Sequence, residues 1–246
     1  MFQVSKKRID FYGNVKFKYL DFIGWGSHSD IYKISVEGKN YALKVFNDFY
    51  IQEELDRLDE YKEKLNMNID SFIFPMKLLY VNDEFMGYLM KLCRGRDLSR
   101  KNLDLDIEMF AKSSIKLFKD VQKLSELKYA MADNHISNIM YDNGFKWIDT
   151  SDFTYLKGKS LSEIEALNLK LANEVLIDIF VNSTGIASVF LKDNDIKRII
   201  NRCTSLKITF EELFNEICMM AYNITNEEIT KVSDVGKVLK KHYDKI

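Results

Sequence analysis

The pattern of apolar and polar positions divides the chain into a strand-rich first part and a helix-rich second part. Residues 16–46 alternate between apolar and polar side chains in three runs, and a turn at 37–40 joins the second run to the third. Residues 50–66 change to helical spacing, and two more strand-like runs follow over 72–81 and 84–92. The first 91 residues are therefore predicted to form five strands and one helix.

The second part is predicted to be mainly helical. Apolar residues recur at helical spacing over 104–128, and residues 161–181 are apolar enough to form a buried helix. Ser or Thr followed three residues later by Glu is the pattern of a capping box, which predicts a helix start. Three such pairs occur: Ser160 with Glu163, Thr209 with Glu212, and Thr225 with Glu228. We expect an α+β fold with one domain over 1–91 and a second over 92–246.

The composition is that of a soluble globular protein. Of 246 residues, 46% are hydrophobic and 30% charged, and the net charge of -1 provides no basic field, so we expect no nucleic acid partner. Cys93, Cys203 and Cys218 lack C-x-x-C spacing and indicate neither a zinc site nor a disulfide framework, which favours a reducing compartment. A single proline with many Lys, Ile and Asn indicates an AT-rich coding genome and favours a bacterial source.

No apolar run is long enough for a membrane span, and the N-terminus has charges where a signal peptide needs apolar residues. We expect a cytoplasmic protein, with export as an effector left open.

The stretch 131–153 concentrates the candidate chemistry. It contains Asp133, then Asn138 five residues later, and then Asp149 beyond a predicted hairpin whose turn is Asn143-Gly144. Carboxylate and amide oxygens, together with phosphate, are ligands that Mg²⁺ prefers. Taken alone, the stretch is more typical of polar turns, because Asp and Asn readily bond the local backbone.

A second candidate is the glycine-containing segment 24–29, which lies between the first two predicted strands. Glycine at a hairpin tip lets backbone N–H groups approach an anion that a Cβ would obstruct. A flexible surface turn explains this segment equally well when it is taken alone.

Taken in order, these features resemble the protein-kinase-like superfamily over about residues 16–153. Residues 23–32 resemble the nucleotide-covering loop, with Ser29 in place of the third glycine, and Tyr41-Ala42-Leu43-Lys44 resembles the V-A-I-K strand. The resemblance implies a bilobal fold, with a five-stranded antiparallel N-lobe containing one helix and a mainly helical C-lobe. It also implies ATP and Mg²⁺ as cofactors.

The resemblance implies how the nucleotide is bound. Lys44 would contact the α- and β-phosphates and pair with Glu54, with Glu53 the less favoured partner. In the hinge-like stretch 90–98, the Lys91 and Cys93 backbones would meet adenine. Met90 would be the gatekeeper there, and Asp97 would approach the ribose. The nucleotide-binding positions are Gly24, Gly26, Ser29, Ile31, Ala42, Lys44, Glu54, Met90, Lys91, Cys93 and Asp97.

The resemblance also implies the catalytic roles. Asp133 aligns with the catalytic base, and Asn138 and Asp149 align with the metal ligands. His135 follows the pattern D-x-H-x-x-N of aminoglycoside-phosphotransferase-like enzymes. It is either a phosphate contact or a turn histidine that bonds the local backbone.

Several family features are missing from the sequence. Met131-Ala132 stands where His-Arg normally precedes the catalytic aspartate, so we expect no phosphorylated activation loop. Asp149-Thr150-Ser151 replaces D-F-G, nothing resembles A-P-E, and about ten residues separate Asp149 from the next predicted helix start. The chain is expected to be a small, divergent member with a reduced activation segment and C-lobe.

The resemblance implies a phosphotransferase that moves the γ-phosphate of ATP to a hydroxyl, with a protein Ser/Thr slightly favoured as acceptor. A small-molecule kinase is the first alternative, and a pseudokinase acting as a nucleotide-binding interaction module is the second. An activating protein partner that holds the Lys44–Glu54 pair closed is a further hypothesis.

Overall fold

The structure is a computed structural model, and it describes residues 9–11, 17–65, 67–98, 105–184, 193–226 and 228–243. The chain folds as two compact units. Unit 1 contains the described residues up to Asn68 together with Ile73–Arg94, and unit 2 contains Ile69–Phe72 with the described residues from Gly95 onward. The sequence-based boundary between residues 91 and 92 stays a prediction.

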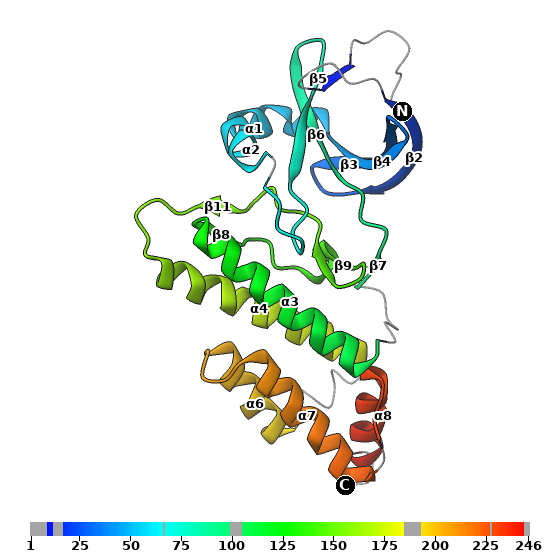
Figure 1. Cartoon of the computed structure of the whole chain (residues 1–246), viewed down its shortest axis with the longest axis vertical. Helices are drawn as coiled ribbons and strands as arrows, with labels where there is room; N and C mark the ends of the chain where they lie inside the picture. The colour runs from blue at the N-terminus through cyan, green and yellow to red at the C-terminus, as the bar shows by residue number, and fades with distance from the viewer. Residues whose placement is uncertain are drawn as a thin grey trace. The chain divides into compact units, whose positions relative to one another are not determined.

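Unit 1 is built on a six-stranded antiparallel sheet in the order β1-β5-β6-β4-β3-β2, drawn from blue to teal in Figure 1. All five predicted strands form, and a short strand β1 adds to the edge by pairing with β5. The strands are β1 Ile9–Phe11, β2 Lys18–Trp25, β3 Ser29–Val36, β4 Lys39–Phe46, β5 Pro75–Val81 and β6 Glu84–Lys91.

Two-residue turns set the register of this sheet. Glu37 and Gly38 between β3 and β4 have φ of 49° and 79°, and Asn82 and Asp83 between β5 and β6 have φ of 53° and 67°. Positive φ at both central residues matches the right-handed twist of the flanking strands. One side of the sheet then buries a continuous aliphatic core made of Ile34, Val36, Leu43, Val45, Leu79, Val81 and Leu89.

The single helix predicted over 50–66 is broken in two. A short 3-10 segment η1 (Asp48–Tyr50) leads into α1 (Ile51–Asp56), and α2 (Leu58–Lys64) follows after Arg57, which has φ -96° and ψ 7°. Within α1 the apolar Leu55 is exposed while the charged Glu54 is buried. The helical spacing was therefore correct, but a continuous helix was wrong.

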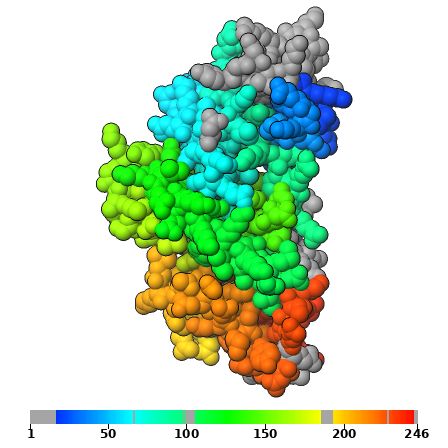
Figure 2. All heavy atoms as spheres, in the orientation of Figure 1, coloured from blue at the N-terminus to red at the C-terminus, as the bar shows by residue number. Residues whose placement is uncertain are grey.

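Unit 2 is dominated by helices that pack around aromatic rings. The Phe110 ring of α3 lies 5.3 Å from Phe145, 5.9 Å from Phe180 and 5.2 Å from Phe214, between ring centroids. α3 and α4 lie side by side in Figure 1, and Figure 2 shows α3 (green) exposed on the face that also carries α7 and α8. The helices are α3 Ile107–Glu126, α4 Leu161–Thr184, α6 Asn194–Thr204, α7 Phe210–Thr225 and α8 Val232–Tyr243.

Two of the three predicted capping boxes are present. Ser160 and Glu163 exchange hydrogen bonds before α4, and Thr209 and Glu212 do so before α7. The third was wrong, because Thr225 is the last residue of α7 and Asn226 (φ 53°) ends that helix in the left-handed conformation. In the described residues, none of the helices combines the length and apolarity needed to cross a bilayer.

The segment Ile69–Phe72 is fixed to α3 within unit 2. The buried Asp120 carboxylate accepts hydrogen bonds from Ser71 N at 3.0 Å and Ser71 Oγ at 2.8 Å. Asp70 accepts from Lys116 and from Lys146, the latter at 2.8 Å, and these bonds hold its pKa at about 2. The segment also contacts the strand Phe145–Trp147 (β10), because Trp147 N–H donates to the Ser71 carbonyl at 2.8 Å.

Candidate active site

The predicted hairpin of the stretch 131–153 is present in unit 2. β9 (Ile139–Tyr141) pairs with β10 (Phe145–Trp147), and the turn contains Asn143 and Gly144 with φ of 51° and 130°. The 3-10 turn η2 (Ile136–Asn138) leads into β9, and β7 (Arg96–Asp97) pairs with β9 on its other side. The hairpin therefore places Asn138 at the start of one strand and Asp149 just beyond the end of the other.

Asp133 and Asn138 are joined directly. The Asn138 amide nitrogen donates to the Asp133 carboxylate at 2.6 Å and to the Asp133 carbonyl at 3.1 Å. Because the amide must present its NH₂ group to these acceptors, its carbonyl oxygen is the atom that remains for a cation. Asp133 also has φ 49°, a left-handed conformation that is uncommon outside glycine and that clusters at functional sites.

Asp149 is brought to the same end of the hairpin by the backbone. Ile148 N–H donates to the Asn138 carbonyl at 2.8 Å, which ties the residue before Asp149 to Asn138. The Asp149 carboxylate accepts from Ser151 Oγ at 2.6 Å and Ser151 N at 3.3 Å. Ser151, at the position of the D-F-G glycine, thus orients the carboxylate with its side chain.

Asn138 and Asp149 suit a magnesium ion whose remaining coordination positions are filled by a bound ligand and by water. Among the described residues, no group of three or more His, Cys, Asp or Glu could hold a metal ion unaided. Asn138 and Asp149 offer one amide oxygen and one carboxylate, and Mg²⁺ commonly takes one or two protein oxygens plus phosphates and waters. A metal here would therefore need a phosphate-bearing partner.

His135 bonds its own turn. Its Nδ1 accepts from Ser137 N–H at 3.3 Å and lies 2.7 Å from Ser137 Oγ, so the ring caps the start of η2. With Nδ1 acting as the acceptor, Nε2 is the ring nitrogen left as a donor. The structure places His135 as the local turn histidine, and the phosphate contact stays a prediction.

Two residues that the sequence patterns did not reveal anchor the segment 129–134, which contains Asp133, to α4. The fully buried Asn168 accepts from Met131 N–H at 2.7 Å and donates to the Tyr129 carbonyl at 2.8 Å. Glu174 accepts from the Asn134 side chain at 3.1 Å. For Asn168 the available signal was an amide in a stretch predicted to form a buried helix, because a buried amide has to find partners.

A cavity of about 550 Å³ lies beside Asp133 within unit 2. His135, Glu174 and Asp178 contribute to its lining. Burial raises the pKa of Asp178, and the neighbouring Glu174 carboxylate adds to the increase while His135 opposes it. Together with Asp133 itself, Glu174 and Asp178 make the lining of this cavity rich in carboxyl groups.

In unit 1, Lys44 lies on an internal strand of the sheet and is buried. It lies on β4 with 6% of its surface exposed, opposite Ile31 of β3, and its Nζ is 5.7 Å from the centre of the Tyr88 ring. Gly87 of β6 is needed here, because a Cβ would lie 2.0 Å from the Lys44 carbonyl oxygen. The requirement for glycine at this position was another feature that the sequence patterns did not reveal.

Glu54 is only 3% exposed. It accepts a short hydrogen bond from the Tyr61 hydroxyl, lies 3.7 Å from Arg57 Nη1, and approaches the His28 ring. Burial, with the Tyr88 and Glu54 side chains, raises the pKa of Tyr61. The predicted pairing of Glu54 with Lys44 stays a prediction.

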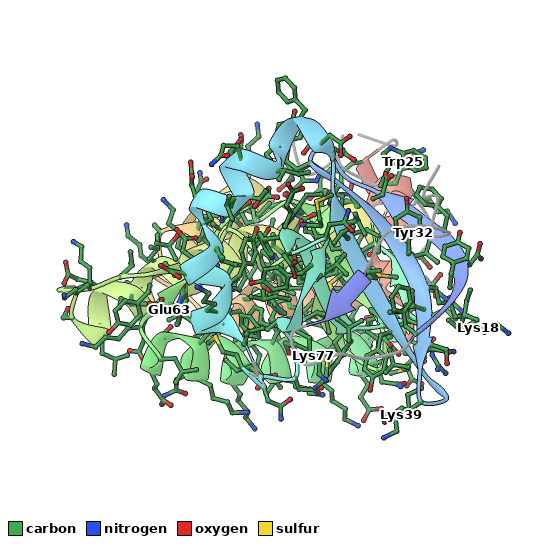
Figure 3. All side chains as sticks on the ribbon, turned by 90° about the horizontal axis from the view of Figure 1, so that it is seen from above. Lys18, Trp25, Tyr32, Lys39, Glu63 and Lys77 are labelled. Atoms are coloured by element: carbon green, nitrogen blue, oxygen red, sulfur yellow. The ribbon has the colours of Figure 1, made fainter. Side chains whose placement is uncertain are left out.

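The glycine-containing loop closes between β2 and β3. Gly26 N–H donates to the Ser29 carbonyl at 2.7 Å, and the Ser29 side chain is buried. A Cβ at Gly24 would meet nothing within 4 Å, so packing inside unit 1 does not demand glycine there. Trp25 projects from the β2 side of the sheet (Figure 3), and its ring stacks on Phe22 with the ring centroids 6.3 Å apart.

The hinge-like residues follow β6. Met90 is buried opposite Ala42 of β4, and Lys91 ends the strand with its Nζ 2.8 Å from Asn68 Oδ1. Cys93 is partly exposed. Asp97 lies in β7, and its side chain is outside the described residues.

Comparison with known proteins identifies the fold as protein-kinase-like. No family model matches the chain, and no curated protein matches it significantly in sequence. Among solved structures, the kinase domain of PF14_0431 aligns with a TM-score of 0.55 and 16% identity, covering 68% of this chain and 64% of that one. Rad53 residues 1–466, solved with AMP-PNP, aligns with a TM-score of 0.57 and 15% identity, covering 81% and 60%.

The predicted fold class is therefore confirmed. At this identity the likeness concerns the fold, and the chain spans about three-fifths of the length of these two neighbours.

Proposed function

We propose that this protein is an ATP- and Mg²⁺-dependent phosphotransferase that moves the γ-phosphate of ATP to a hydroxyl group. One observation carries the proposal. The Asn138 amide binds the Asp133 carboxylate and keeps its own oxygen for a cation, while the Asn138 backbone ties in the residue before Asp149. This arrangement supports assigning Asp133 as the base and the oxygens of Asn138 and Asp149 as metal ligands, which are groups that phosphoryl transfer needs.

Each residue then has a stated task. Lys44 would bind the α- and β-phosphates, Asn138 and Asp149 would hold magnesium, and Asp133 would orient the acceptor hydroxyl and take its proton. The acceptor oxygen forms a bond to the γ-phosphorus as the bond to the β-phosphate oxygen breaks, and ADP leaves. Bound magnesium would supply positive charge to the phosphate oxygens.

The acceptor that we favour is a protein Ser or Thr. The loop and hinge patterns of the sequence support it, as does the kinase likeness of the fold. A small-molecule acceptor is the second candidate, supported by the D-x-H-x-x-N pattern and by the acidic cavity beside Asp133, whose charge suits an acceptor bearing an amine. The short connection between Asp149 and α4 also fits this candidate, because little chain is left to form a peptide platform.

Calorimetric titration of ATP, with and without Mg²⁺, tests the nucleotide site. Wild type should bind ATP with Mg²⁺, and Asp149→Ala should lose the metal-dependent part of the affinity. Asp152→Ala is the matched control, because it removes an exposed carboxylate from the same turn. Binding that ignores both metal and Asp149 would instead indicate a pseudokinase.

Turnover tests the catalytic assignment. Release or transfer of the γ-phosphate should fall by at least about a hundredfold in Asp133→Asn and in Lys44→Met, because each variant removes a group used in the transition state. Unchanged turnover in both variants would refute the assignment. Full activity of the isolated chain would show that no activating partner is required.

A further inference from the structure

His28 joins the glycine-containing loop to the helical segment of unit 1. Its imidazole stacks on the Tyr50 ring, with centroids 3.9 Å apart and planes inclined by 10°. Its Nδ1 lies 3.3 Å from Oε1 of Glu54. One side chain of the loop Gly24–Ser29 therefore reaches both η1 and α1.

Backbone contacts hold the same half of this loop. Asn47 N–H donates to the His28 carbonyl at 2.9 Å, and the Asn47 side chain lies 3.5 Å from the Ser27 carbonyl. The other half is open only on its side-chain face, since Trp25 is 79% exposed and a Cβ at Gly24 would meet no atom within 4 Å. Its backbone belongs to β2 and pairs with β3. The loop thus has a docked half, at 27–29, and an open half, at 24–25.

The carboxylate that receives His28 is buried. Tyr61 and Arg57, which also approach Glu54, belong to the same helical segment, whereas His28 comes from the loop. A hydrogen bond from an imidazole N–H to a carboxylate is charge-assisted and belongs to the stronger class. The side chain of His28 is 39% exposed and that of Glu54 is 4% exposed, so the contact is partly shielded from water.

We propose that His28 is a positioning residue that docks the loop Gly24–Ser29 on Glu54 and so presets the loop for the phosphates of a nucleotide. This inference rests on the proposed function, because it assigns the loop to phosphate binding. A loop that is ordered beforehand loses less conformational entropy when its ligand binds. Loss of the contact therefore weakens ATP binding and leaves the transfer step largely intact.

Two substitutions separate the ring stack from the hydrogen bond. His28→Phe keeps an aromatic ring for Tyr50 but removes the nitrogen that faces Glu54. His28→Asn loses the ring but keeps an N–H donor attached to Cγ, as Nδ1 is in histidine. His242→Phe is the control, because this exposed histidine lies in α8 of unit 2.

We expect His28→Phe to raise the KM for ATP about tenfold with kcat within about a factor of two, since one charge-assisted bond is lost. His28→Asn should recover most of the affinity, and His242→Phe should match wild type. An unchanged KM in His28→Phe, or an equal loss of kcat and affinity in both His28 variants, would overturn the positioning role.

Amide hydrogen exchange without nucleotide supplies an independent readout. Residues 27–29 should exchange faster in His28→Phe than in wild type and in His242→Phe, because the docked half of the loop is released. Equal exchange in all three proteins would contradict the docking. If wild type binds no ATP, the proposed function fails and the phosphate role of the loop fails with it, while the exchange comparison still decides whether His28 docks the loop.

Discussion

Replacing Asn168 with alanine tests how the segment that leads to Asp133 is held in place. Asn168 lies on α4 with no exposed surface. Its side chain accepts from Met131 N–H at 2.7 Å and donates to the Tyr129 carbonyl at 2.8 Å and to Ser125 Oγ at 2.9 Å. These bonds fix the backbone that enters the loop immediately before Asp133.

The cost of the substitution follows from these contacts. Each hydrogen bond contributes about 1 kcal/mol net, and a buried backbone group left without a partner costs about 1–3 kcal/mol. Ser125 Oγ keeps its bond to the Val121 carbonyl at 2.9 Å, so the penalty falls mainly on Met131 and Tyr129. We expect Asn168→Ala to lower the free energy of unfolding by about 3–4 kcal/mol.

Asn173→Ala is the matched control. Asn173 is also buried on α4, and its side chain donates to the Cys203 carbonyl at 3.2 Å, away from the loop. The two variants lose the same atoms from the same helix, and the control should cost about 1–2 kcal/mol. Denaturant unfolding measures both values, and the phosphotransfer rate should fall only in Asn168→Ala. The reasoning fails if Asn168→Ala is no more destabilising than Asn173→Ala.

Three further outcomes are expected. Asp70→Asn should destabilise the protein by no more than about 1 kcal/mol at pH 7, because the ion pairs of Asp70 are partly exposed. The lowered pKa of Asp70 means that this stability is present above about pH 4 and is lost as the pH falls toward 2, so acid unfolding of wild type and variant should converge there. Gly236→Ala should cost about 1–3 kcal/mol in thermal unfolding, because the new Cβ would lie 1.9 Å from an α4 carbonyl oxygen; unaltered stability would contradict this packing. Tyr61→Phe should cost about 1–3 kcal/mol in denaturant unfolding, because the buried Glu54 carboxylate loses a donor. A double-mutant cycle with Glu54→Gln should give a cost for the double variant below the sum of the two single costs, and an additive result would contradict the contact.

Local patterns predicted the parts of this fold that depend on neighbouring residues. Three of the five strands followed from alternation and two from strand-like runs, and the hairpin around Asn143-Gly144 followed from the preference of these residues for positive φ. Two capping boxes were recognisable because a Ser or Thr and a Glu three residues later bond each other. The third predicted capping box was wrong, since Thr225 is the last residue of α7 and Asn226 ends that helix.

The break at Arg57 shows where local patterns stop being sufficient. The apolar spacing alone favours one helix over 50–66. The structure instead has two short helices, and the residues buried in them include the charged Glu54 as well as Tyr61. The inward position of Glu54 depends on partners from the loop and from α2, which no helical periodicity describes.

The sequence by itself determined the fold class and the five main strands of the sheet, and it nominated the candidate chemical groups, because propensity, turn chemistry and motif spacing are local properties of the chain. Only the tertiary structure decided that Asn138 binds Asp133, that His135 caps its own turn, and that Asn168 holds the loop. It also decided that His28 reaches Glu54. A hydrogen bond depends on distance and direction between groups, and these are set by how distant segments pack.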